Sequence, residues 1–247
     1  MQAYAESNIG LVREENQDVY RLVKVDPRTA LFLVCDGMGG AAGGKEAART
    51  AAETFATAFC EGFAAVVGAE RPTPFAVQRV FTGAVYRANL AVFERAVSEP
   101  DLAGMGTTLT AACISGNMLF VANVGDSRAY LIRDAAARQL TRDDSLVQQL
   151  VDEGQMSAGA AKGCEYKHLL TRALGPGQYV EFSFLHETLH RTDRVLLCSD
   201  GLCAYHTEQS IASLAGGGDL RTATRALIAE ACRGGGRDNI TCVLVEI

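Results

Sequence analysis

The chain has 247 residues, 48% hydrophobic and 21% charged, which is the profile of a globular protein with room for one large domain or two small ones. Its net charge of −6 argues against nucleic acid as the main partner. The N-terminal residues show no secretion signal and no apolar run could span a membrane, so a cytoplasmic protein without a membrane segment is expected.

The first half of the sequence predicts short strands followed by two long helices. The alternating and apolar runs favour strands, and the Ala-rich segments with apolar spacing near 3.6 favour helices. The strands are expected at Ala3–Ala5, Asp18–Val25 and Leu31–Cys35, and the helices from Lys45 to about Val67 and from Phe75 to about Ser98, with a break at Arg71–Pro74.

The second half changes period and is rich in strands. Three β-rich runs, TTLTAACI, MLFVANV and RAYLIR, are separated by turn formers and predict a meander of antiparallel strands. After an irregular segment, 141–177, we expect strands at Val180–His186, Arg194–Cys198 and Ile240–Ile247 and helices at Glu208–Ala215 and Leu220–Cys232. Strands grouped with strands favour an α+β fold over regular βαβ alternation.

The stretch LFLVCDGMGGAAGGKE, residues 31–46, has two interpretations. Gly39–Lys45 fits the pattern G-x-x-x-x-G-K of a nucleotide-binding loop, in which backbone N–H groups hold phosphates. That loop needs Ser or Thr after the lysine to hold Mg²⁺, and Glu46 stands there instead. The alternative is that Asp36 is a metal ligand at the end of a strand.

Four aspartates share a similar setting. Each lies at the end of a predicted strand or in a loop beside one, namely Asp18, Asp36, Asp200 and Asp238. Each alone is well explained as a turn residue. Together, they predict a site for hard cations such as Mg²⁺ or Mn²⁺, because converging carboxylates repel one another unless metal ions separate them.

Seven stretches give the chain a family resemblance. They are 10–18 (GLVREENQD), 34–40 (VCDGMGG), 106–108 (GTT), 123–128 (NVGDSR), 170–175 (LTRALG), 198–202 (CSDGL) and 237–241 (RDNIT). In this order they resemble the metal-dependent serine/threonine protein phosphatases of the PPM family (type 2C), in their bacterial form. The resemblance implies one domain over residues 1–247 with a flap-like segment at about 141–177. It also implies a four-layer α/β/β/α sandwich of two mainly antiparallel sheets flanked by helices.

The resemblance implies two Mn²⁺ or Mg²⁺ ions, and a third in bacterial members. Asp36 matches the ligand that bridges the two core metals, and the Gly37 carbonyl binds one of them. Asp200 and Asp238 match ligands of the other metal, and Asp18 matches a residue that holds metal-bound water. The remaining matches are Arg13, which grips substrate phosphate, Asp126, which shares the third metal with Asp200, and Asn239, which supports the Asp238 loop.

The implied reaction is hydrolysis of phosphoserine or phosphothreonine by direct attack of a water or hydroxide that bridges the metals. The expected partners are phosphorylated proteins, including a bacterial Ser/Thr kinase or its substrates, in signalling. A monomer is expected. Two other functions stay open at this point: a binding module that has lost catalysis, and a nucleotide-binding enzyme built on residues 39–45.

The sequence departs from the family pattern at several positions. Met38 stands where many eukaryotic members have a histidine proposed as general acid, which leaves the proton donor to the leaving group open. Asp144 replaces a histidine that the family usually shows. The flap-like segment has Cys164 and His168 in place of the usual His-Pro and Asn pattern, so substrate preference or rate is expected to differ.

Overall fold

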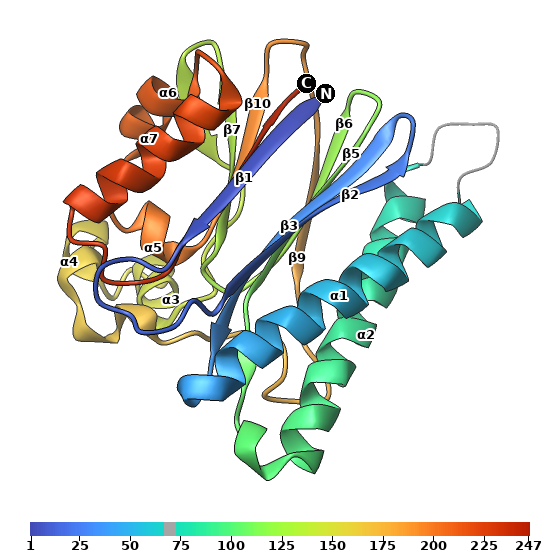
Figure 1. Ribbon diagram of the computed structural model, residues 1–247, viewed down its shortest axis with the longest axis vertical. Coiled ribbons are helices and arrows are strands. Elements are labelled where there is room, and N and C mark those ends of the chain that lie inside the picture. The colour runs from blue at the N-terminus through green and yellow to red at the C-terminus, as the bar shows by residue number, and fades with distance from the viewer. Residues whose placement is uncertain (67–72) are drawn as a thin grey trace.

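Two β-sheets lie face to face at the centre of the molecule, with helices on both outer sides (Figure 1). The computed structural model describes residues 1–66 and 73–247. The strands are β1 (Gln2–Asn8), β2 (Asp18–Asp26), β3 (Thr29–Met38), β4 (Gly106–Thr107), β5 (Leu109–Ser115), β6 (Met118–Val124), β7 (Arg128–Arg133), β8 (Ala136–Gln139), β9 (Ser183–Thr188), β10 (Arg194–Cys198) and β11 (Ile240–Glu246).

The helices fall into an outer pair on each side and a group of short helices near one end. The α-helices are α1 (Gly40–Val66), α2 (Pro74–Ser98), α3 (Leu146–Asp152), α4 (Ala158–Gly163), α5 (Asp200–Cys203), α6 (Glu208–Ala215) and α7 (Leu220–Arg233), and the 3₁₀ helices are η1 (Pro100–Leu102) and η2 (Glu165–His168). No helix in the described ranges is both long and apolar enough to cross a lipid bilayer.

Each sheet is antiparallel throughout its described pairings. One sheet has the order β1-β11-β10-β7-β8, and the other has β2-β3-β5-β6-β9 with β4 beside β3. In the first sheet, Gln2 pairs with Glu246 and Asn8 with Ile240, so the start of β1 and the end of β11 lie side by side (Figure 1). A doubly wound nucleotide-binding sheet needs parallel strands, so this topology excludes it.

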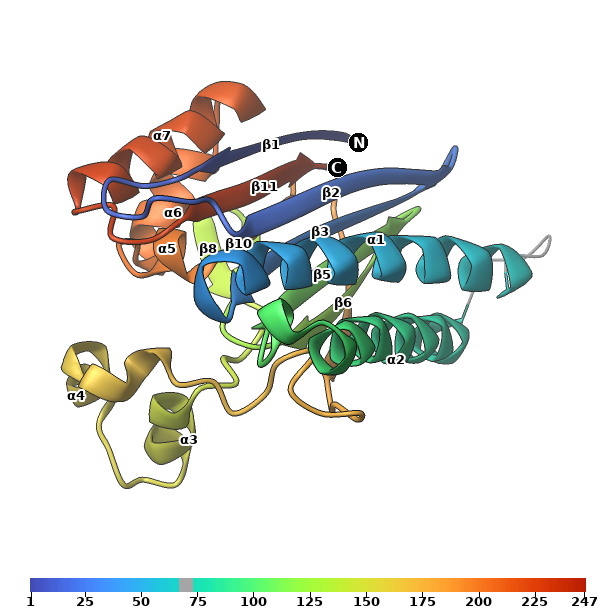
Figure 2. The ribbon, with the colours of Figure 1, turned by 60° about the horizontal axis from the view of Figure 1, so that its bottom comes forward.

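Three hydrophobic clusters produce the layers. Alternate residues of a strand face opposite sides, so each sheet buries one face against the other sheet and one against helices. Phe32 and Val243 belong to the cluster between the sheets, Leu33 to the cluster under α1 and α2, and Leu244 to the cluster under α6 and α7. Together these clusters form the predicted four-layer α/β/β/α sandwich of an α+β fold (Figure 2).

Both predicted long helices are present, but α1 begins at Gly40 and not at the predicted Lys45. α2 begins at Pro74 behind the N-cap Thr73, whose side chain accepts a hydrogen bond from the Ala76 N–H. α1 ends at Val66, and the predicted positions 67 and 71–72 lie outside the described residues. The helices at Glu208–Ala215 and from Leu220, and the strand at Arg194–Cys198, are confirmed.

The predicted meander is wrong at its third strand. β5 and β6 pair as expected, with Leu109 opposite Val124. β7 leaves that sheet and pairs with β10 of the other one, with Arg128 opposite Cys198. The prediction of a strand at Val180–His186 is also displaced, since β9 begins only at Ser183. The chain therefore crosses between the sheets at Gly125–Ser127, a turn that looks like a hairpin in the sequence.

Candidate active site

Aspartates from both sheets gather at the end of the sandwich that lies away from the start of β1. Asp18 and Asp36 are direct register partners on β2 and β3, so their side chains leave the same face of one sheet. In the other sheet, Asp200 follows β10 and Asp238 precedes β11, and these two strands are antiparallel neighbours. The structure thus brings together the four aspartates that the sequence singled out.

A cleft of about 1020 Å³ opens over these strand ends. Its lining includes Asp36, Asp126, Asp200 and Asp238, while Asp18 is buried with 8% of its surface exposed. Every aspartate with a predicted metal role therefore lies in or next to one cavity. Arg13, Gly37 and Asn239 also line it.

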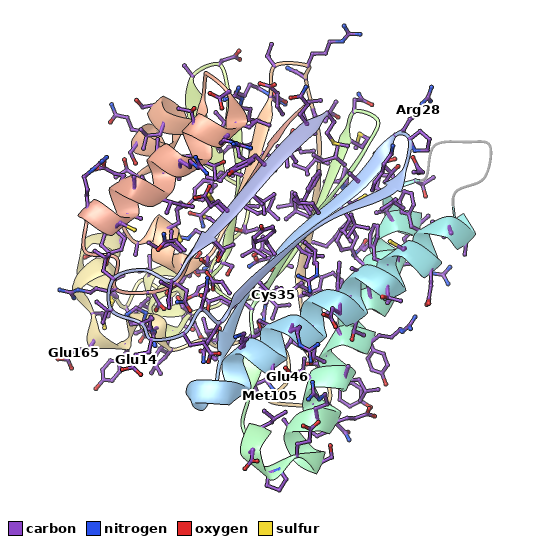
Figure 3. The ribbon with its side chains drawn as sticks, viewed as in Figure 1. Glu14, Arg28, Cys35, Glu46, Met105 and Glu165 are labelled. Carbon is purple, nitrogen blue, oxygen red and sulfur yellow. The ribbon has the colours of Figure 1, made fainter. Side chains whose placement is uncertain are left out.

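The backbone of Asp36 is fixed by the strand beside it. Its N–H donates to Thr108 Oγ1 at 2.9 Å, and its carbonyl oxygen accepts from the Thr108 N–H and from Thr107 Oγ1, each at 2.9 Å. Cys35, labelled in Figure 3, directly precedes Asp36 and is fully buried. Because the N–H and the carbonyl group of Asp36 are both hydrogen-bonded, its carboxylate projects from a rigid position on β3.

Two of the glycines in residues 37–44, Gly37 and Gly44, lie where two backbone segments cross closely. A Cβ on Gly37 would lie 2.0 Å from the carbonyl oxygen of Gly44, at the start of α1. Lys45 is engaged with Glu15, its Nζ lying 2.9 Å from Oε1. The glycine pattern therefore serves packing at the end of β3, and the nucleotide-loop interpretation is wrong for this antiparallel fold.

Asp18 joins the two sheets through Ser199. Ser199 Oγ donates to Asp18 Oδ2 at 2.7 Å and accepts from the Thr241 N–H at 3.0 Å. Within the described residues, Asp18 Oδ1 and Asp200 Oδ1 are buried and accept no hydrogen bond. Two desolvated carboxylate oxygens without a donor are costly unless a cation or water compensates them.

Burial raises the pKa of three of these carboxyl groups. The pKa of Asp18 rises to about 7, against the opposing hydrogen bond from Ser199, and the pKa of Asp126 rises to about 8 through burial and the charge of Asp200. Burial and the adjacent charge of Asp18 hold the pKa of Asp36 well above its ordinary value. The cluster therefore stores electrostatic repulsion that positive charge would relieve.

The loop between β1 and β2 carries Arg13 to the edge of this cluster. Arg13 Nη2 donates to Asp238 Oδ2 at 2.7 Å, while 54% of the arginine side chain stays exposed. Asn239 holds the loop: its Oδ1 accepts from the Gln17 N–H at 2.8 Å, and its Nδ2 donates to the carbonyl oxygens of Ile9 and Glu15, each at 3.0 Å. The predicted support by Asn239 therefore extends from the Asp238 loop to the Arg13 loop.

Asp144 ties the flap, residues 141–177, to the turn that carries Asp126. Its Oδ2 accepts from the Gly125 N–H at 3.1 Å, and its Oδ1 accepts from Arg172 Nη1 at 3.1 Å. The Thr171 N–H donates to the Asp144 carbonyl at 2.8 Å. The aspartate that replaces the family's usual histidine thus joins both limbs of the flap at its base.

His168 is the flap residue that reaches the aspartate cluster. It lines the cleft, and its Nδ1 lies 3.6 Å from Asp200 Oδ2. The sequence marks His168 only as a departure from the family pattern, because nothing near a lone histidine in the sequence shows what it will face. Ser199 was missed as well, although its place between the buried Cys198 and Asp200 was a usable signal.

A metal ion requires several oxygen donors around one point. As they stand in the described part of the chain, no three Asp, Glu, His or Cys side chains already enclose one point. Asp238 is engaged with Arg13, and Asp18 with Ser199. The donor set nevertheless fits a hard cation, since it consists of carboxylates, two of them with buried oxygens that accept no hydrogen bond.

A pH dependence of stability follows for the protein in EDTA. Asp18 and Asp126 have pKa values of about 7 and about 8 in the folded protein, against 3.8 for an ordinary aspartate, so the folded chain binds more protons than the unfolded chain between pH 3.8 and pH 8. The free energy of unfolding therefore falls as the pH rises through that range. We expect a higher melting temperature at about pH 5.5 than at about pH 8, and a smaller difference in Asp126→Asn. A higher melting temperature at the alkaline pH would contradict the assignment.

The two-sheet sandwich is the fold of the PPM phosphatases. The family model described as protein phosphatase 2C matches residues 12–231, and the chain belongs to this family. It is 36% identical, over 98% of its length, to the serine/threonine protein phosphatase PstP of Mycobacterium tuberculosis, of which it spans 44%. It is 34% identical, over its whole length and 96% of the relative, to the serine/threonine phosphatase stp of Listeria welshimeri.

One solved structure adds information on metals. The crystal structure of the PstP catalytic domain in complex with two manganese ions has a TM-score of 0.81 to this chain. The sequence identity is 34%, and the similarity covers 99% of this chain and 97% of that one.

Proposed function

We propose that residues 1–247 form a single metal-dependent phosphatase domain that hydrolyses phosphoserine and phosphothreonine in proteins. The observation that carries the proposal is one cleft in which buried carboxylates of raised pKa meet an exposed arginine. Carboxylates and an arginine are the groups that hold metal ions and a phosphate side by side. The family membership supports the same reaction.

The residues that would hold the metals come from both sheets. Asp36 would lie between two Mn²⁺ or Mg²⁺ ions, with the Gly37 carbonyl on one of them and Asp200 and Asp238 on the other. Asp18 would orient a coordinating water, and Asp126 would share a third ion with Asp200. The two manganese ions in the related PstP structure support two core positions and leave the third as a proposal from the position of Asp126.

The metals would supply a bridging water or hydroxide for direct attack on phosphorus and would offset charge on the phosphoryl oxygens. The chain's own residues would place the substrate. Arg13 contacts Asp238 with one nitrogen, and more than half of its side chain is exposed at the cleft, so donors of its planar guanidinium are available to phosphate oxygens. The buried backbone around Asp36 fixes where the metals would stand relative to that arginine.

The proposed partners are proteins phosphorylated on serine or threonine, including a bacterial Ser/Thr kinase or its substrates. The names of the M. tuberculosis and Listeria relatives support this substrate class. The flap would then border the path of the substrate, since His168 and Leu170 line the cleft from it.

Release of phosphate from a phosphothreonine peptide tests the proposal. We expect release to begin when Mn²⁺ is added and to stop with excess EDTA, because the carboxylates alone offer no positive charge to the phosphoryl oxygens. Inorganic phosphate is measured in both conditions. A folded protein that binds Mn²⁺ and releases no phosphate would instead support the binding-module alternative.

A further inference from the structure

Exposed hydrophobic side chains concentrate in two short segments. In residues 9–12, Leu11 is 68% and Val12 is 65% exposed. In residues 166–169, Tyr166 is 59% and Leu169 is 51% exposed. Single exposed hydrophobic residues are ordinary, but groups of them in neighbouring positions indicate an interaction surface.

The two segments flank the same cleft. Val12 and Arg13 line it from the loop after β1, and His168 and Leu170 line it from the flap. Figure 2 shows the loop and the flap on separate sides of α5, and Figure 3 marks them with Glu14 and Glu165. On each side of the phosphate site proposed at Arg13, one apolar side chain therefore lines the cleft, Val12 from the loop and Leu170 from the flap. Exposed Leu11 and Leu169 lie next to them in the sequence, and these two pairs are called the rims.

Both rims are held by backbone hydrogen bonds. The Leu11 N–H donates to the Gly236 carbonyl at 2.7 Å, and Asn239 Nδ2 donates to the Ile9 carbonyl at 3.0 Å. On the flap, the Leu146 N–H donates to the Leu169 carbonyl at 2.8 Å, and the Leu169 N–H donates to the Tyr166 carbonyl at 3.1 Å. The apolar side chains are thus presented from fixed positions, which lowers the entropy lost when a partner binds.

We propose that these rims bind apolar side chains of the substrate on both sides of its phosphoresidue, so that the enzyme prefers phosphoproteins with apolar residues there. The inference rests on the proposed phosphatase function. In an extended peptide, alternate side chains face the same way. When a phosphothreonine points into the cleft, the side chains two positions before and after it therefore face the rims. The side chains of the directly adjacent positions face the opposite way.

A peptide panel tests this preference. Phosphothreonine peptides carry Leu at the positions two residues before and after the phosphoresidue, or Ser at both, or Leu at the adjacent positions instead. We expect the first peptide to have a KM lower by about five- to tenfold than the Ser peptide, from burial of two apolar side chains. Equal KM values for the three peptides would overturn the proposal.

Surface variants locate the effect. Val12→Ser and Leu170→Ser, at two positions that line the cleft, are compared with Val97→Ser and Leu22→Ser, whose parent side chains are 70% and 43% exposed and lie outside the cleft lining. The rim variants are expected to erase most of the advantage of the Leu peptide, and the control variants to keep it. An advantage that survives in the rim variants would refute the rims as its source.

A small substrate separates this proposal from the proposed function. Hydrolysis of p-nitrophenyl phosphate with Mn²⁺ is measured for each protein, because that compound cannot reach both rims. Hydrolysis of p-nitrophenyl phosphate, combined with equal KM values for the three peptides, would refute the rim proposal alone. Absence of Mn²⁺-dependent hydrolysis of every substrate would refute the phosphatase function, and the rim proposal with it.

Discussion

Asp36→Asn is expected to lower Mn²⁺-dependent phosphate release by about a thousandfold or more and, in EDTA, to make the protein more stable. The carboxylate would neutralise two cations at once, and an amide of the same shape carries no charge to do so. Without metal the same charge is a liability, because Asp36 is half-buried opposite Asp18 and its pKa is held well above the ordinary value. Activity and stability should therefore change in opposite directions.

The stability change is measured as a melting temperature in EDTA at about pH 8, where an increase of about 2 °C or more is expected. Asp101→Asn is the matched control, since Asp101 is exposed on η1 and away from the cleft lining. It should alter neither quantity. Full activity in Asp36→Asn would remove Asp36 from the site, and a lower melting temperature would show that its charge is compensated by the fold.

Gly37→Ala is expected to destabilise the protein by about 3 kcal/mol or more. The added Cβ would lie 2.0 Å from the Gly44 carbonyl oxygen and 2.9 Å from that of Gln17. Both carbonyl groups belong to the backbone, so β3 or the start of α1 must move. Denaturant unfolding measures the loss.

Gly83→Ala is the natural comparison for this substitution. Gly83 lies inside α2, and nothing is within 4 Å of the position that its Cβ would take. Alanine favours helix over glycine, so a gain of about 1 kcal/mol is expected. If Gly37→Ala were tolerated as well as Gly83→Ala, the close crossing at the end of β3 would not describe the protein.

The sequence was a good guide to local structure and a poor guide to sheet membership. The runs around β5, β6 and β7 all have strand character, and Gly125-Asp126-Ser127 has the composition of a hairpin turn. Only tertiary contacts, including the hydrogen bonds between Gly125 and Asp144, take β7 into the other sheet. β8 was missed because four half-exposed residues carry little pattern, and pairing with β7 holds them.

The site shows the same limit. The acidic residues could be singled out from their places at strand ends, but their convergence came from the family resemblance. Spacing along the chain does not show that Asp18 lies opposite Asp36, or that Ser199 bonds Asp18 across the sheets. His168 reaches Asp200 only because the flap folds back, and no local pattern encodes that return.

The place of β11 sets when the site can form during synthesis. β11 lies between β1 and β10, so β1 has no neighbour in its sheet until residues 240–246 have been made. Asn239, which immediately precedes β11, also holds the Arg13 loop. A ribosome that has translated nine-tenths of the chain therefore carries the early aspartates with no complete cleft, and a nascent phosphatase would stay inactive until its last strand emerges.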